Sequence, residues 1–360
     1  MTSVTKFQAF IIMIAIISII STSLLFFSTT PHIPIVLIIF LLILFSIVTN
    51  RVQSLFEGIK NGMTAVITPL VLFILIGMLI SVLMLSGTIP TIMYYGSQIM
   101  SITYFLPSVF FLSAIIGSSL GSAFTTVSTI GVAFMTIGLL IGFPAPIIAG
   151  AIISGACLGD KMSPLSDTTN LAATVCKVDL FEHIKHMLWT TGPAFILTTI
   201  LFFILGSRIT FIPKHDIFHH LDPLLETGLI SKISILPLLV MFFFAWKKKS
   251  AIVVLFFGIL AALIVSLLVH QHMQITTIMK VVIDGFSITT GDEKIDQMLN
   301  RGGILSMFWS ISLVVLTLTM GGIIQAFGVL TKLMEFIRNW AVSTAKLVMA
   351  TVLTAIGINV

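Results

Sequence analysis

The sequence predicts an all-α polytopic membrane protein, and three observations support this fold class: composition, continuous apolar segments and loop charge. Of the 360 residues, 58% are hydrophobic and only 9% are charged, whereas a soluble domain carries about 25% charged residues. So few charges cannot cover a soluble surface, which excludes a soluble enzyme, a nucleic-acid binder and a disordered chain. The apolar stretches do not alternate in short segments, which excludes a transmembrane β-barrel.

About eleven segments are predicted to cross the bilayer, because a span needs roughly 20 mostly apolar residues. They are approximately Phe7–Phe27, Ile33–Val48, Thr64–Ser86, Phe105–Ser118, Ala123–Gly142, Pro146–Leu158 continuing to Lys177, Trp189–Gly206, Ile233–Trp246, Ala251–Val269, Ile304–Ala326 and Ser343 to the end. The first segment is too long for the core of a signal peptide and no cleavage site follows it, so we expect it to be retained.

Loop charges predict that the N-terminus lies inside the cell. With that orientation the inside segments hold eleven Lys and Arg residues and the outside segments hold six. The three consecutive lysines Lys247–Lys249 are the strongest single indication. This bias agrees with the positive-inside rule, so the net charge of +5 is assigned to cytoplasmic loops and not to nucleic-acid binding.

An internal repeat is found when the chain is shifted by 241 residues, which pairs Gly62 with Gly303 and Gly87 with Gly328. In the predicted topology the Thr64 span runs outward and the Ile304 span runs inward. The copies would therefore be inverted repeats with broken helices or re-entrant hairpins, a common architecture of secondary transporters.

The repeat predicts four regions. They are N-terminal helices and a cytoplasmic loop (1–61), a first repeat (62–189), connecting helices (190–302) and the start of a second repeat (303–360). The second copy stops at Val360, almost where its most polar part should begin. We therefore expect the second repeat to be truncated, with about 80 to 100 further residues missing if its symmetry is complete.

The first intramembrane polar stretch covers residues 117–131 and is rich in glycine and hydroxyl side chains. Close helix packing through Gly117 and Gly121, spaced as GxxxG, is one interpretation. Packing would not require its five closely spaced hydroxyls, Ser122, Thr125, Thr126, Ser128 and Thr129. Hydroxyls and freed carbonyls are the hard oxygen donors that a small alkali cation prefers.

The second polar stretch covers residues 159–170, where Gly159 and Pro164 are expected to break a helix. Ser166 or Asp167 can cap a new half-helix that runs toward Lys177. Asp160 and Lys161 could neutralise each other, Asp167 could be a simple cap, or the whole stretch could lie at the surface. Alternatively, one carboxylate binds either a cation or a proton, so that the two compete for it.

A family resemblance enters at this stretch. The string GDKMSPLSDTTNLAATV (159–175) is similar to the signature of the NhaC-type Na+/H+ antiporter family, part of the wider ion-transporter superfamily, which includes sodium-coupled malate/lactate antiporters. Four other strings resemble it too: SAFTTVSTIGVAFM (122–135), PIIAGAIISGACLGDK (146–161), SGTIP (86–90) and LNRGGILSM (299–307). The resemblance runs from about residue 50 to the end and implies a multi-pass secondary transporter of the bacterial cytoplasmic (inner) membrane.

The resemblance implies an ion- and proton-binding site, with Na+ bound there and no transition metal. Its residues are Asp160, Ser163, Ser166, Asp167, Thr168, Asn170, Thr125, Thr126, Ser128 and Thr129. Asp167 is favoured as the proton carrier, because it stands at a half-helix start and has no adjacent cation, whereas Asp160 has Lys161 beside it.

The predicted function is secondary exchange of Na+ for H+. The alternative is an organic-acid antiporter of the malate/lactate type on the same scaffold, since half-helix N-termini favour carboxylates. A passive channel is a third hypothesis.

We do not expect an enzyme, because no nucleophile–base pair or hydrolysis motif is present. We also expect no cofactor. The expected partners are Na+, H+, a small carboxylate in the alternative, the lipid bilayer and a second copy in a homodimer, with no nucleic acid.

Overall fold

A computed structural model describes the fold over most of the chain. It covers residues 4–99, 104–164, 166–208, 225, 227–247, 249–270, 274–291, 296, 299–340, 343, 345–346, 348–349 and 351–352. The backbone alone is described at 96–99, 128, 129, 140, 167, 336, 337, 339 and 340. Within these residues the regular structure is helical and no strand occurs, which confirms the predicted all-α class.

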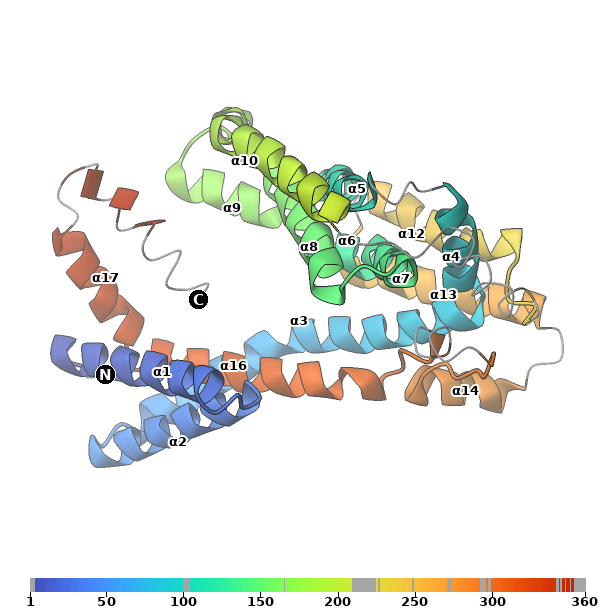
Figure 1. The fold of residues 1–360 in the computed structure, drawn as a ribbon. Coiled ribbons are helices and arrows are strands. Elements are labelled where there is room, and N and C mark those ends of the chain that lie inside the picture. The colour runs from blue at the N-terminus through green and yellow to red at the C-terminus, as the bar shows by residue number, and fades with distance from the viewer. Residues whose placement is uncertain are drawn as a thin grey trace. The chain divides into compact units, whose positions relative to one another are not determined.

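The chain divides into two compact units, Met1–Val71 with Phe308–Val360, and Leu72–Met307. The helices of the first unit are α1 (Lys6–Leu25), α2 (His32–Val48), the first part of α3 (Val52–Leu85), α16 (Phe308–Ala326) and α17 (Val329–Trp340) (Figure 1). Thr5 starts α1 with a reciprocal capping box to Gln8, which satisfies two backbone N–H groups that the first turn leaves free.

Small residues hold two helices of the first unit at close range. A Cβ on Gly58 would lie 2.6 Å from the Ile323 Cα, and one on Gly62 would lie 2.5 Å from the Leu318 carbonyl oxygen. The first part of α3 therefore packs backbone to backbone on α16, as small residues permit in membrane helices.

The second unit contains the rest of α3 and a longer series of helices. They are α4 (Thr88–Ile99), α5 (Phe105–Leu120), α6 (Ala123–Thr126), the π-helical turn η2 (Val127–Gly131), α7 (Val132–Ile141), α8 (Ala145–Met162), α9 (Asp167–Cys176), α10 (Leu180–Arg208), η3 (Lys232–Ile235), α12 (Leu236–Trp246), α13 (Ala251–Val269), α14 (Ile275–Asp284) and η4 (Leu305–Met307).

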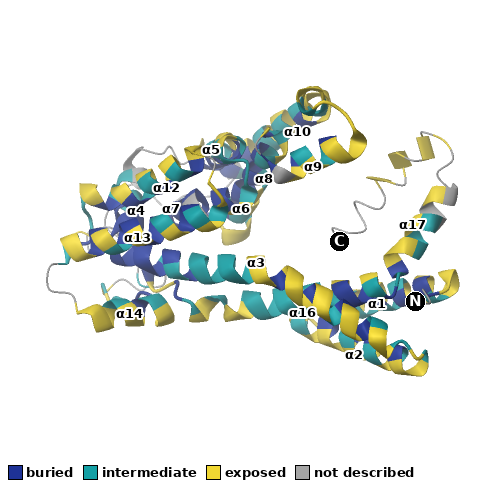
Figure 2. Ribbon diagram, turned by 180° about the vertical axis from the view of Figure 1, so that it is seen from behind, coloured by how far each residue is buried: buried dark blue, intermediate teal, exposed yellow. Residues whose placement is uncertain are grey.

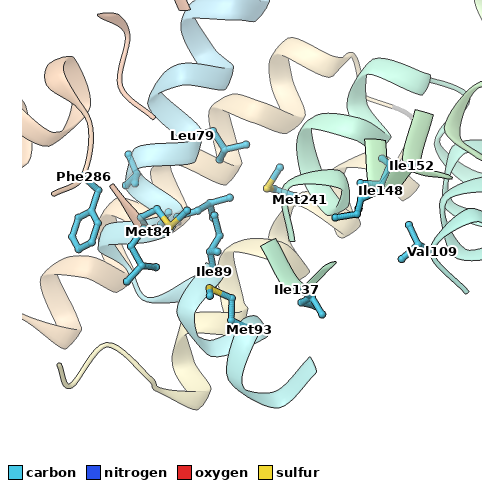
Figure 3. Packing of buried hydrophobic residues seen from close by; sticks show 14 of the residues in the cluster. Leu79, Met84, Ile89, Met93, Val109, Ile137, Ile148, Ile152, Met241 and Phe286 are labelled. Atoms are coloured by element: carbon cyan, nitrogen blue, oxygen red, sulfur yellow. The ribbon is translucent and has the colours of Figure 1, made fainter. Parts of the chain in front are cut away.

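The buried core of the second unit lies where α3, α4, α5, α7, α8 and α13 meet (Figure 2). Figure 3 shows Met84, Ile89, Val109, Ile137 and Ile148 among its apolar side chains. Aromatic pairs add directional contacts: Phe105 stacks on Phe143 at 5.3 Å, and Phe110 lies 5.2 Å from Phe195 of α10 between ring centroids. This core fixes α5, α7 and α8, the helices that adjoin the polar stretches.

The predicted spans agree with the helices. Six described helices are long and apolar enough to cross a membrane, and three shorter apolar ones fall in predicted spans. The predicted span at 123–142 is also helical, as α6, η2 and α7 in succession. Many large apolar side chains, such as Leu197 and Trp246, are exposed, as expected of a lipid-facing surface. Most of the predicted C-terminal span lies outside the described residues, so that span remains a prediction.

Three described helices were not predicted: α4, α14 and α17. Each has 10 to 12 residues, too few for a search that looks for spans of roughly 20. The helix α3 also begins at Val52, twelve residues before the predicted span. The search for apolar spans missed these first turns because they carry the polar residues Glu57, Lys60 and Asn61. The division at residues 61, 189 and 302 concerns repeat symmetry and remains a prediction.

Candidate functional site

The second polar stretch forms a break between two helices. The helix α8 ends at Met162 and α9 begins at Asp167, with Ser163 and Ser166 in extended conformation between them. The predicted discontinuity is therefore present, and Pro164 lies inside it. Gly159 does not break the helix, contrary to our expectation. Its missing side chain has a packing role instead, since a Cβ there would meet the Ala114 carbonyl oxygen and lie 2.6 Å from the Ser118 nitrogen.

Side chains tie the two ends of the break together. The Thr169 hydroxyl donates to the Lys161 carbonyl at 2.9 Å, across the gap from α9 to α8. The Asn170 amide donates to the carbonyls of Pro164 at 3.0 Å and Ser166 at 2.8 Å. These bonds satisfy carbonyls that a broken helix leaves free, so the break has a defined geometry.

Ser166 occupies the N-cap position of α9, as one of the two predicted caps. Its side chain makes no capping hydrogen bond to the backbone. Its hydroxyl lies 2.9 Å from that of Thr168 instead. Ser163 and Ser166 are buried and Thr168 is exposed. Asp167 is the first residue of α9, and its side chain lies outside the described part of the structure.

Asp160 lies in the last turn of α8, and one carboxylate oxygen, Oδ1, is buried with no hydrogen-bond partner among the described residues. The neighbouring Lys161 side chain is exposed, so no contact supports mutual neutralisation of the two. A buried carboxylate oxygen without a partner is unfavourable in an apolar interior. The described surroundings of the Asp160 carboxylate therefore favour binding of a proton or a cation.

The first polar stretch reverses the chain and then interrupts a helix. Gly121 ends α5 with a φ of +61°, a left-handed conformation that glycine adopts readily, so it is a turn residue and not part of a GxxxG packing face. Ser122 then caps α6 by accepting from the Thr125 N–H at 3.2 Å. The π-helical turn η2 follows, and such turns often occur at functional sites.

The predicted hydroxyls of this stretch differ in environment. Thr125 and Thr126 are buried, and their hydroxyls donate to the Ser122 hydroxyl at 3.0 Å and to the Ser122 carbonyl at 2.9 Å. Ser128 and Thr129 lie in η2, and their side chains are outside the described part. Both α6 and η2 pack against α8, so the structure brings the two polar stretches to one helix.

Glycines in α5 and α8 allow this approach. A Cβ on Gly117 would lie 2.7 Å from the Ala156 carbonyl oxygen, and one on Gly155 would lie 2.8 Å from the Ser113 Cβ. The packing interpretation of Gly117 is thus correct. Ser113 is a polar residue of this interface that the sequence analysis missed, and its hydroxyl is buried without a partner in the part of the chain that the structure describes. The available signal was a hydroxyl within an otherwise apolar run, residues 109–116.

The protein has helices long enough to span a bilayer, and a broken helix that carries charge lies beside a π-helical turn. This combination is typical of secondary membrane transporters. Residues 155–360 match the profile of the Na+/H+ antiporter family. The chain belongs to that family, which confirms the resemblance found in the sequence.

Three relatives in particular are similar over most of the chain. The Na(+)/H(+) antiporter NhaC of Alkalihalophilus pseudofirmus is 40% identical over 348 residues, covering 95% of this chain and 74% of that protein. The Na(+)/H(+) antiporter NhaC of Bacillus subtilis is 34% identical, covering 96% and 77%. The malate-2H(+)/Na(+)-lactate antiporter of Bacillus subtilis is 31% identical, covering 86% and 65%. No solved structure matches the chain.

Proposed function

We propose that the chain exchanges Na+ for H+ across the cytoplasmic membrane of a bacterium, with its N-terminus inside. The observation that carries this proposal is the buried Oδ1 of Asp160 at the broken end of α8, which no described residue binds. Membership of the Na+/H+ antiporter family and the names of two relatives support Na+ and H+ as the exchanged ions. In this proposal the chain is not an enzyme and needs no cofactor, and a homodimer is its expected assembly.

Coupling follows from the cost of an uncompensated charge. An ionised side chain at membrane depth costs about 2.5–3.5 kcal/mol on insertion scales. Either a proton or a Na+ ion removes most of that cost, because each neutralises the carboxylate. The site is therefore stable when it holds one of the two ions, which favours exchange over uncoupled movement.

The ligands are proposed from the residues that the break and the adjoining turn supply. Asp160 or Asp167 provides the carboxylate. The hydroxyls of Ser163, Ser166, Thr168, Thr125, Thr126, Ser128 and Thr129, the Asn170 amide and freed backbone carbonyls provide neutral oxygens. Rocking of one helix bundle against another would open this site to each side in turn.

A second candidate function is sodium- and proton-coupled exchange of an organic acid. The similarity to the malate/lactate antiporter favours it, and the two more similar relatives named as Na+/H+ antiporters favour simple exchange. The two functions differ in one requirement, because only the second needs an organic acid for ions to move.

The test is proton movement in proteoliposomes, with the protein expressed together with any sequence that adjoins residues 1–360 in its gene. A pH-sensitive dye inside the vesicles reports the response to an imposed Na+ gradient. We expect Na+ alone to move protons. No response until malate or lactate is added would establish the second function, and a response to K+ as large as that to Na+ would contradict both.

A further inference from the structure

A cavity of about 590 Å³ lies within the second unit, apart from the residues of the proposed ion site. Its walls come from α3, η2, α7, α8, the end of α14 with residues 285 and 286, residues 300–302 and η4. The lining residues are Ile80, Met84, Val127, Gly131, Val132, Met135, Thr136, Ala149, Ile152, Ile153, Asp284, Gly285, Phe286, Asn300, Arg301, Gly302, Ser306 and Met307. Small-molecule sites are typically apolar cavities of about 300–1,000 Å³ with a few polar groups, and this cavity fits that description.

The polar wall of the cavity is held in place by backbone contacts. The Phe286 N–H donates to the Arg301 carbonyl at 3.2 Å, and the Gly303 N–H donates to the Gly77 carbonyl of α3 at 2.8 Å. Gly285 and Gly302 have φ values of +104° and +86°, which other residues rarely adopt. Phe286 belongs to the buried core (Figure 3). The cavity is therefore preformed.

Most polar side chains of the lining are already engaged within the protein. The Thr136 hydroxyl donates to the Val132 carbonyl at 2.7 Å, and the Ser306 hydroxyl donates to the Gly303 carbonyl at 2.7 Å. The Asn300 side-chain oxygen accepts from the Ile288 N–H at 2.7 Å. Arg301 has an interaction of its own. These groups shape the wall and have less left to offer a ligand.

Asp284 differs from them, because it makes no hydrogen bond or ion pair with any described residue. It is exposed and is the last residue of α14. A helix C-terminus already carries partial negative charge from its free carbonyls. The carboxylate adds a full negative charge there. Arg301, the other charged residue of the described lining, already has an interaction of its own, so Asp284 is the group of this wall that is left to attract a cation.

We propose that this cavity binds a small organic cation, with its charged nitrogen at Asp284 and its apolar body against Met84, Met135 and Ile153. A single water takes up only about 30 Å³, so the volume far exceeds what one Na+ ion needs, and the apolar walls give an inorganic ion few oxygen ligands. The predicted orientation places Asp284 on the external side. This site goes beyond the proposed exchange, which uses Asp160 and Asp167.

The test is equilibrium binding of benzyltrimethylammonium to the purified protein in detergent, measured by saturation-transfer NMR and calorimetry. This probe has a permanent charge and an apolar ring, and it cannot carry protons. We expect saturable binding that weakens at least tenfold in Asp284→Asn. Asp179→Asn is the matched control, because Asp179 caps α10 through two N–H groups and asparagine keeps that role. Binding should be unchanged in this control.

A second variant tests volume instead of charge. Ala149→Phe places a ring in the cavity from α8 and leaves Asp284 intact, and we expect it to abolish binding of the probe. Benzenesulfonate, an anion of similar shape, should not bind. Equal binding of the anion, equal binding by Asp284→Asn, or no binding of the cation by the folded protein would overturn the proposal. Na+/H+ exchange without the probe should persist in both variants, which separates this site from the ion site.

Discussion

Asp160 and Asp167 stand on opposite sides of the break, and their roles are the main question at the scale of single residues. The sequence places Lys161 beside Asp160 as a possible neutralising neighbour, whereas in the structure no described residue binds the buried Oδ1 of Asp160. Asp167 begins α9, where the free N–H groups of the first turn stabilise a carboxylate without a cation. These surroundings make Asp160 at least as strong a candidate proton carrier as Asp167.

The first prediction compares neutral variants of these two residues. Asp160→Asn should reduce Na+-driven proton movement at least a hundredfold, because an amide cannot exchange a proton for a cation. Asp167→Asn should have the same effect only if that carboxylate also carries the ion. The measurement is the initial rate of dye response in proteoliposomes with equal protein content. Wild-type rates in Asp160→Asn would contradict the role given to Asp160.

At the scale of helices, α5 packs closely against α8, which carries Asp160, because three glycines let the two helices touch. Gly117, Gly155 and Gly159 each leave no space for a Cβ. Sequence alone indicated two of these glycines, Gly117 as a packing residue and Gly159 as a helix breaker. The second assignment was wrong. Glycine has a low helix propensity, but close packing of α8 against α5 stabilises the helix at Gly159.

The second prediction concerns this contact. Gly159→Ala should destabilise the protein by about 1–3 kcal/mol, because the new methyl group meets the backbone of α5. Gly150→Ala is the matched control on the same helix, where nothing lies within 4 Å of the added Cβ. It should be neutral or stabilising by up to about 1 kcal/mol. Thermal unfolding in detergent measures both, and equal melting temperatures for the two variants would contradict the packing role.

The third prediction concerns the bond that bridges the break. Thr169→Val removes the hydroxyl that donates to the Lys161 carbonyl, and it should cost about 1 kcal/mol and slow exchange. Thr174→Val removes a similar bond to Asn170 within α9 alone. Stability and transport rate are measured together for both. If Thr174→Val slowed transport as much as Thr169→Val, the bridge across the break would have no special role.

At the scale of the whole molecule, contacts inside each unit support the predicted inverted repeat. In the first unit the missing Cβ of Gly62 faces the Leu318 carbonyl oxygen. The shift of 241 residues pairs Gly62 with Gly303, and it pairs Leu318 with Gly77. In the second unit the Gly303 N–H donates to the Gly77 carbonyl at 2.8 Å. Residues related by the 241-residue shift are thus in close contact in each unit, as the predicted inverted repeat requires.

The fourth prediction tests orientation. Ser250→Cys, placed after the three-lysine turn in a background with Cys157→Ser and Cys176→Ser, should react with a membrane-impermeant maleimide in inverted vesicles and not in intact cells. The reason is that cytoplasmic loops carry the excess of Lys and Arg. Labelling in intact cells would show that the orientation is opposite to the predicted one, with Asp284 on the cytoplasmic side.

The sequence was informative where a feature is long or chemically distinctive, and less so where packing decides. Long apolar runs identified the major helices, and the string at 159–175 identified the broken helix. The helix α4 was missed because its buried residues, such as Ile89 and Met93, belong to a segment too short to span. Ser113 was missed because only its position against Gly155 shows that its hydroxyl is buried.

Competition between Na+ and H+ for one carboxylate is tested most directly by measuring the Na+ affinity of the protein as a function of pH. Binding of radioactive Na+ to the purified protein would be followed across a pH series, for the wild type and Asp160→Asn. If Na+ and H+ compete for one carboxylate, the wild-type affinity should fall about tenfold per pH unit below the pKa of that group. It should be weak and independent of pH in the variant. A wild-type affinity that does not change with pH would contradict the account.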